Sequence, residues 1–149
     1  MTAKTWRTVR TVQVGDVWLM RHPADGGTVV VTIGGELTLD VAKPVRDLVS
    51  LLLTEAKVKK RIKSLVLDLR PADYVVPRFV IMIVDLQKEA SAQGTGLEIV
   101  VGSRARRALE KLRFLPTGDL FAHTKVRYAV AAARATTGTA RATTWTGGR

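Results

Sequence analysis

The chain has 149 residues, a net charge of +11 and an apolar content of 46%, a composition typical of a single folded globular domain. Because it contains no cysteine, disulfide bonds and thiolate metal sites are excluded. The longest unbroken apolar run, Phe79 to Val84, is far shorter than the ~20 residues of a membrane-spanning helix, and the basic residues 1–12 lack the apolar segment of a secretory signal, so we expect a cytoplasmic protein.

The first predicted elements form a β-hairpin. Strand-like runs at Val17–Met20 and Thr28–Ile33 are separated by Pro23-Ala24-Asp25-Gly26-Gly27, in which Asp-Gly-Gly is a turn signal. Gly34-Gly35 is predicted to end the second strand. The domain therefore starts with two antiparallel strands.

A helix is predicted after this hairpin, because apolar residues recur with a 3.6-residue period. Its inward face consists of Val41, Val45, Leu48, Val49, Leu52 and Ala56. Thr38 or Asp40 can cap the helix, and Pro44 fits within its first turn. The short apolar run Leu65–Leu69 then predicts a buried central strand.

The segment from Pro77 to Gln93 is predicted to be a second helix. It contains many β-branched residues, but Pro77 suits a helix start, and Gly94 and Gly96 suit its end. The residues that share its inward stripe are Phe79, Met82, Ile83, Leu86 and Ala90. Their spacing favours a helix over a strand.

Four further segments complete the prediction. Leu97–Val101 is expected to be a strand, Arg104–Arg113 a helix, Leu120-Phe121 a short strand, and residues 124–135 a last helix. The arrangement predicts one domain over residues 13–135, with a basic arm at residues 1–12 and a disordered Thr, Gly and Arg tail at residues 136–149.

This order of elements, with particular residues, resembles the STAS domain of anti-sigma-factor antagonists. The similarity includes the strand and Gly-Glu-Leu turn at Val29–Leu37, the strands Leu65–Leu69 and Leu97–Gly102, the helix Ala105–Leu112, and the closing strand Gly118–Phe121. It covers about 100 residues. The resemblance implies an α/β domain whose mixed sheet has about four to five strands, with helices mainly on one side. It also implies a non-catalytic signalling and transcription regulator without a cofactor.

Two departures from the family's pattern bear on function. Thr38 stands where the family usually has Asp after Gly-Glu-Leu, and Asp40 follows two positions later. Members that act as phospho-switches carry Asp-Ser-Ser/Thr-Gly at the start of the helix after the central strand, whereas this chain has Val76-Pro77-Arg78-Phe79 there. A phosphate at that helix start would add about two negative charges and repel the partner kinase. We therefore predict a domain that is not a serine or threonine phospho-switch.

An apolar and cationic segment replaces the switch. Val80, Ile81 and Val84 lie off the inward stripe of the second helix, so this helix is either buried on most sides or exposes an apolar patch for a protein partner. The resemblance places partner binding at this edge of the fold. The predicted contact residues are Thr38, Asp40, Tyr74, Val75, Val76, Pro77, Arg78 and Val80.

Positive charge is concentrated in two sequence clusters. One consists of Lys57, Lys59, Lys60, Arg61 and Lys63, and the other of Arg104, Arg106, Arg107, Lys111 and Arg113. Each cluster is either a solvated surface or a basic patch that attracts nucleic acid, acidic protein surfaces or anionic lipid. The groove-reading motifs of nucleic-acid-binding proteins are absent.

The sequence gives little support for a catalytic site. The histidines, His22 and His123, have no acidic neighbour at metal-ligand spacing, and Asp73 is better placed to cap a loop than to act with Asp68 in acid–base chemistry. We predict no enzyme activity, cofactor or metal. Trp145 in the tail is either tolerated or an anchor in a partner groove.

We predict a STAS-like regulatory or scaffolding module. Its expected partner is an anti-sigma factor or a switch kinase of the ATPase type, or another STAS protein, including a second copy in a homo-oligomer. The alternatives are an electrostatic binder of nucleic acid or anionic membrane, and an accessory subunit of a transporter. Binding to phosphates would weaken steeply with salt, whereas an apolar protein interface would not.

Overall fold

The computed structural model describes residues 11–23, 25–59, 62–103, 106–107, 122–123 and 131–132. Within these ranges one mixed sheet has the strand order β1-β2-β3-β4-β6-β7, and β5 pairs with β3 beside that path. Its strands are β1 (Thr11–Val14), β2 (Val17–Pro23), β3 (Thr28–Leu37), β4 (Ser64–Asp68), β5 (Ala72–Val75), β6 (Gly96–Val100) and β7 (Ala122–His123). A short 3-10 turn, η1 (Asp25–Gly27), and two helices, α2 (Leu39–Lys59) and α3 (Pro77–Ala92), complete the elements.

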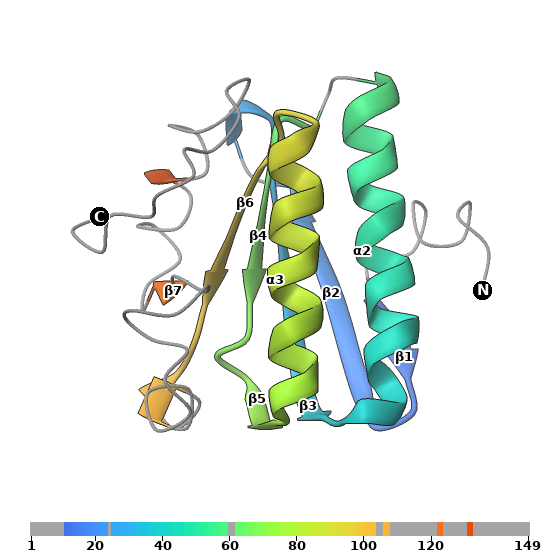
Figure 1. Cartoon of the computed structure of the whole chain (residues 1–149), viewed down its shortest axis with the longest axis vertical. Helices are drawn as coiled ribbons and strands as arrows, with labels where there is room; N and C mark the ends of the chain where they lie inside the picture. The colour runs from blue at the N-terminus through green and yellow to red at the C-terminus, as the bar shows by residue number, and fades with distance from the viewer. Residues whose placement is uncertain are drawn as a thin grey trace.

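Both helices cover the same face of the sheet (Figure 1). The strands β3, β4 and β6 are parallel neighbours in that order, and α2 and α3 form the two connections between them. Right-handed crossovers that advance in one direction across a sheet place their helices on one side. The carboxyl ends of these strands and the first turns of both helices therefore meet at the same end of the molecule.

The core lies between the helices and the sheet, and it confirms both predicted helix faces. All six residues of the predicted α2 stripe are buried, as are all five residues of the α3 stripe. The strands supply the opposing side chains, among them Leu19, Ile33, Leu65 and Ile99. The fold class predicted from the sequence is therefore confirmed.

The strands depart from the sequence prediction in three places. The described sheet has seven strands, because β1 and β5 were not predicted, and Thr11 and Val12 belong to β1 rather than to the predicted arm. β3 does not end at Gly34-Gly35 but continues to Leu37. A strand is also present at Ala122–His123. Most of the predicted helices 104–113 and 124–135, the residues Leu120-Phe121 and the tail lie outside the described residues.

The glycine pair remains within β3 because of what packs on it. Trp18 of β2 is the cross-strand partner of Gly34, and a Cβ at Gly34 would lie 2.3 Å from the Trp18 indole. Gly35 has a φ of +101° and sits where the β3–β5 register shifts. A Cβ at Gly35 would lie 2.6 Å from the carbonyl oxygen of Asp16. Two glycines that look like a strand terminator are thus required by close contacts inside the strand.

Replacing Gly35 by alanine is expected to destabilise the domain by about 2 kcal/mol or more, because the left-handed backbone and the contact with the Asp16 carbonyl both oppose a side chain. The control is Gly15→Ala: Gly15 has a φ of +58°, but its Cβ would meet nothing closer than Val41 at 3.9 Å, so only about 1 kcal/mol is expected. Urea unfolding of both variants measures the difference. Equal losses of unfolding free energy in the two variants would show that the contact with the Asp16 carbonyl relaxes without an energetic cost.

Candidate functional site

The candidate site is the end of the molecule where β3 and β5 finish and α2 and α3 begin. β5 runs parallel to the last residues of β3, with Glu36 opposite Tyr74 and Leu37 opposite Val75. The backbone N–H of Val76 donates to the carbonyl of Leu37 at 3.0 Å. Residues 72–75 are therefore held by strand pairing before α3 starts.

The start of α3 has no side-chain cap. Val76 occupies the N-cap position in an extended conformation, and Pro77 follows within the first turn. The carbonyl of Val76 accepts hydrogen bonds from the N–H groups of Phe79 and Val80, at 3.0 and 3.4 Å. A hydroxyl side chain, which would usually occupy this N-cap, is replaced here by an apolar one.

The start of α2 is polar. The carbonyl of Thr38 accepts from the N–H of Val41 at 3.3 Å, and the Thr38 hydroxyl donates to the carboxylate of Asp40. This hydrogen bond, together with one from the Asp40 backbone, lowers the pKa of the Asp40 carboxyl. Asp40 is exposed, so it presents a negative charge at this end at neutral pH.

Six of the eight predicted contact residues are accessible at this end: Thr38, Asp40, Tyr74, Val76, Pro77 and Arg78. The other two predicted contact residues are buried, which corrects the prediction: Val75 is 8% exposed and Val80 is 1% exposed. Val80 belongs to the hydrophobic core, and on α3 it shares a stripe with Val84 and Gln87, of which Gln87 donates to the Leu97 carbonyl of β6 at 3.3 Å. The side chains of Val75 and Val80 therefore belong to the core.

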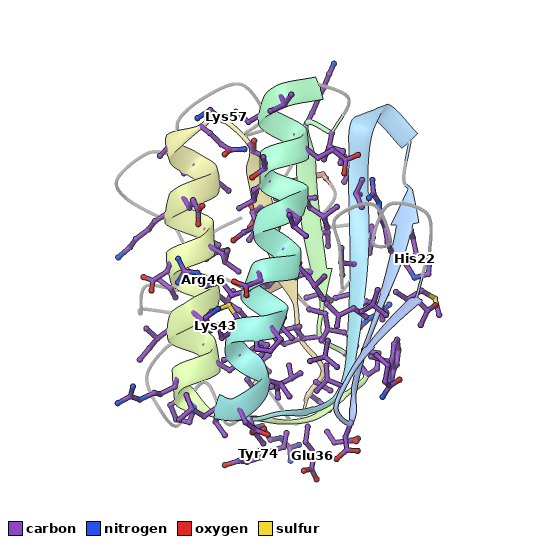
Figure 2. The ribbon with its side chains drawn as sticks, turned by 90° about the vertical axis from the view of Figure 1, so that its right-hand side faces the viewer. His22, Glu36, Lys43, Arg46, Lys57 and Tyr74 are labelled. Carbon is purple, nitrogen blue, oxygen red and sulfur yellow. The ribbon has the colours of Figure 1, made fainter. Side chains whose placement is uncertain are left out.

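The exposed apolar residues at this end are Leu39 at 59%, Tyr74 at 56% and Ile81 at 50%. Sequence reasoning missed Leu39, although it precedes and falls outside the inward stripe of α2 that begins at Val41. Four exposed acids, Asp16, Glu36, Asp40 and Asp73, lie around these residues. Figure 2 shows Glu36 and Tyr74 projecting from this end. We call Leu39, Tyr74 and Ile81, with these four acids, Pro77 and Arg78, the end surface.

Asp68 lies nearby at the end of β4 but is fully engaged. Its carboxylate accepts from Arg70 Nε and Nη2, both at 2.8 Å, and from the Arg70 backbone N–H at 3.1 Å. The same hydrogen bonds raise the pKa of Arg70. Within the described residues no group of three His, Cys, Asp or Glu is placed to hold a metal. Asp68 and Arg70 therefore form a structural ion pair at the connection between β4 and β5.

The two basic clusters do not form one patch. Lys57 and Lys63 flank the connection from α2 to β4, at the end opposite Glu36 and Tyr74 (Figure 2). The backbone N–H of Arg106 donates to Gly102 just after β6, so Arg106 and Arg107 follow the other end of the parallel strands. The side chain of Lys59 and the residues Lys60, Arg61, Arg104, Lys111 and Arg113 lie outside the described part of the chain.

No model of a protein family matches the sequence, and no curated protein does. Solved structures match over most of the chain. An anti-sigma factor antagonist from Mycobacterium paratuberculosis is 17% identical with a TM-score of 0.66, over 83% of this chain and 99% of that one. SpoIIAA in its unphosphorylated form is 15% identical with a TM-score of 0.53, over 78% and 97% of the two chains. SpoIIAA of Bacillus in the phosphorylated form is 13% identical with a TM-score of 0.51, over 76% and 96%.

The chain therefore has the STAS fold of the anti-sigma factor antagonists, as the sequence predicted. No helix among the described residues combines the length and apolarity that crossing a bilayer requires.

Proposed function

We propose that this chain is a non-catalytic regulatory module that binds a protein partner through the end surface. The observation that supports this most directly is that two apolar residues, Leu39 and Tyr74, are exposed at the first turn of α2 and the end of β5, with exposed charged residues at the same end. Protein interfaces combine an apolar centre with a polar rim in this way. The proposed partner is an anti-sigma factor or a switch kinase of the ATPase type, and the second candidate is another STAS protein.

The proposed contact is constitutive. One of the similar structures is a phosphorylated form of SpoIIAA, but this chain has no serine or threonine between Leu65 and Ala90. The pairing of β5 with β3, and the buried side chain of Val75, also hold the segment before α3 in one conformation. A partner bound here would therefore not be released by serine or threonine phosphorylation of this segment.

The test is affinity capture from the native host after nuclease treatment, at low and high salt, with mass spectrometry of the bound proteins. Recovery of an ATPase-type anti-sigma factor or a STAS protein at both salts would support the proposal. Recovery of nucleic acid or anionic lipid alone, lost at high salt, would contradict it and assign binding to the basic clusters.

The double variant Leu39→Asp/Tyr74→Asp is expected to weaken binding of the captured partner by about tenfold or more, because charges in the centre of an interface lose their hydration without a partner. Calorimetry with the purified partner measures the affinity. Val58→Asp is the matched control, since Val58 is 72% exposed at the opposite end of α2, and it should leave affinity unchanged. An unchanged affinity in the double variant would place the interface elsewhere.

Tyr74→Phe separates the two roles that Tyr74 could have. If the ring fills an apolar contact, phenylalanine should bind the partner within about twofold of the unmodified chain, because the aromatic surface is retained. Surface plasmon resonance with the captured partner measures this. A loss as large as that of the double variant would instead assign the contact to the hydroxyl group.

A further inference from the structure

β1 is an edge strand of the sheet: it pairs with β2, and among the described residues no strand pairs with its other side. A two-residue turn, Gly15-Asp16, joins Val14 to Val17, so these two residues form a hydrogen-bonded pair of the hairpin. Hydrogen-bonded and non-hydrogen-bonded pairs alternate along antiparallel strands. Thr11 and Gln13 therefore direct their backbone N–H and C=O groups away from β2, and both residues are exposed.

The free side of β1 carries no side chain that blocks strand pairing. Charged residues, proline and bulges protect many edge strands, whereas β1 has the sequence Thr-Val-Gln-Val and pairs with β2 in an unbroken register. Val12 and Val14 pack on the core, and Thr11 and Gln13 are exposed on the opposite face. An extended strand matches the backbone groups of such an edge. β1 is itself a strand of this kind, with apolar side chains on the helix side only.

α2 adds an apolar stripe next to this edge. Its members, Pro44, Leu51 and Val58, recur every seven residues, which places them on one face of the helix. Pro44 is exposed, Leu51 is half-buried and Val58 is 72% exposed. Val14 and Leu51 both pack against the margin of the core. An additional strand beside β1 would therefore find apolar side chains above it.

The stripe lies on the side of α2 that faces away from α3. Glu55, one turn after Leu51, forms an ion pair with Arg21 of β2 at 3.3 Å. On the other side of the helix, Arg46 lies 3.9 Å from Glu89 of α3. Figure 1 shows β1 beside α2 on the side away from α3. The free edge of β1 and the apolar stripe of α2 thus lie on the same side of the molecule.

We propose that a second copy of this chain pairs its β1 antiparallel with this edge, so that the two sheets become one in a dimer with a two-fold axis. In the register that matches the outward groups, Thr11 lies opposite Gln13 of the second copy, and the reciprocal pair completes about four backbone hydrogen bonds. Val12 lies on the axis. Val12 and Val14 of the second copy are then on the helix side, beside Pro44 and Leu51.

The chain supplies both halves of this contact, as an isologous interface requires. β1 has four residues, and strand pairing over that length is too small for a stable dimer, which buries about 1,200 Å² or more. The apolar side chains beside the edge therefore have to contribute as well. Leu39 and Tyr74 lie outside the contact, so each copy keeps its end surface open. The dimer does not depend on the proposed function.

The first experiment is sedimentation velocity on the purified full chain over a concentration series, in which the unmodified chain is expected to form a dimer. Gln13→Pro should weaken dimerisation by about tenfold or more, because proline removes the outward N–H without breaking a hydrogen bond to β2. Gln13→Thr is the matched control, since it keeps the N–H group and suits a strand, and it should dimerise within about twofold of the unmodified chain.

The apolar stripe is tested by Pro44→Asp, which should weaken dimerisation by about tenfold or more because a charge loses hydration beside the added strand. Val58→Asp is the matched control: it places the same charge on the same stripe, but near the end of α2 that is distant from β1. It should leave dimerisation unchanged. Thermal melts of each variant separate dimerisation from folding.

Val12→Cys tests the register. The chain has no cysteine, and a non-hydrogen-bonded pair brings the two Cα atoms to about 4.5 Å, within the range of a disulfide. Oxidation with diamide should cross-link this variant into a dimer, whereas Ile81→Cys, on the exposed side of α3, should remain a monomer in the denatured state. A chain that stays monomeric, assemblies larger than a dimer, equal effects of Gln13→Pro and Gln13→Thr, or no cross-link through Val12→Cys would each overturn the proposal.

Discussion

Replacing Val80 by aspartate is expected to remove most of the stability of the domain, although Val80 was predicted from the sequence to contact a partner. The side chain of Val80 is 1% exposed and belongs to the hydrophobic core. Loss of its buried surface and burial of a carboxylate together should cost more than about 4 kcal/mol. Because the free energy of unfolding of a single domain is about 5–15 kcal/mol, we expect much of the variant to be unfolded at 37 °C.

The next residue is the matched control. Ile81 is 50% exposed on the same helix, and Ile81→Asp should change the free energy of unfolding by less than about 1 kcal/mol. Urea unfolding followed by circular dichroism measures both variants. Val80→Thr, which keeps the shape of the side chain, should fall between them at about 1–2 kcal/mol. If Val80→Asp were as stable as Ile81→Asp, the packing of α3 described above would be wrong.

This difference decides which variants can map the partner surface. Val80→Asp would abolish binding by unfolding the domain, so its effect would say nothing about contact. Leu39, Tyr74 and Ile81 are exposed at the same end, and substitutions there can change affinity while the fold remains intact. Partner binding should therefore be tested at these three positions, with melting curves beside each affinity.

The helices were predictable because their patterns are local. The stripes of α2 and α3 repeat within one segment, and each pairs a start signal with an apolar face, as Pro77 does for α3. The strands β3, β4 and β6 were predictable from continuous apolar runs between those helices. The order of these elements, and the right-handed crossovers between them, then determine that both helices lie on one face.

The missed strands depend on partners distant in sequence. Ala72–Val75 contains exposed Asp73 and Tyr74 and has no strand pattern of its own. It becomes β5 because the pairing of β3 with β4 ends at Thr32 and Asp68, and the last residues of β3 pair with Ala72–Val75 instead. In the sequence the two glycines of β3 resemble the end of a strand. Their role inside the strand is not visible there, because the Trp18 ring that covers Gly34 belongs to another strand. Local propensity is overridden in both cases by tertiary contacts.

The surface of the candidate site was only partly predictable from the sequence. The resemblance located the edge, and Tyr74, Pro77 and Arg78 are exposed there. The group of acids at this end was not visible in the sequence, because Asp16, Glu36, Asp40 and Asp73 come from four segments that the fold brings to one end. Of the two basic clusters, Lys57 and Lys63 lie at one end of the parallel strands, and Arg106 and Arg107 follow the other end.

Removing one partner of the Arg21–Glu55 ion pair is expected to have the second largest effect on stability. Arg21 Nη1 and Nη2 each lie 3.3 Å from an oxygen of Glu55, and the pair joins β2 to α2. Their side chains are only 18% and 12% exposed. Glu55→Leu leaves the guanidinium partly buried beside an apolar residue, which should cost about 2–3 kcal/mol, somewhat less than for a fully buried pair.

The double variant Arg21→Met/Glu55→Leu should recover most of this loss, since two apolar side chains of similar volume replace the pair without an uncompensated charge. Urea unfolding of the single and double variants gives the coupling free energy. Additive losses would show that the two residues act independently. Because the pair lies near the end of α2 that is distant from Leu39 and Tyr74, the double variant should bind the partner with unchanged affinity. Any loss of affinity would mean that the position of α2 on β2, and not only its first turn, determines the shape of the end surface.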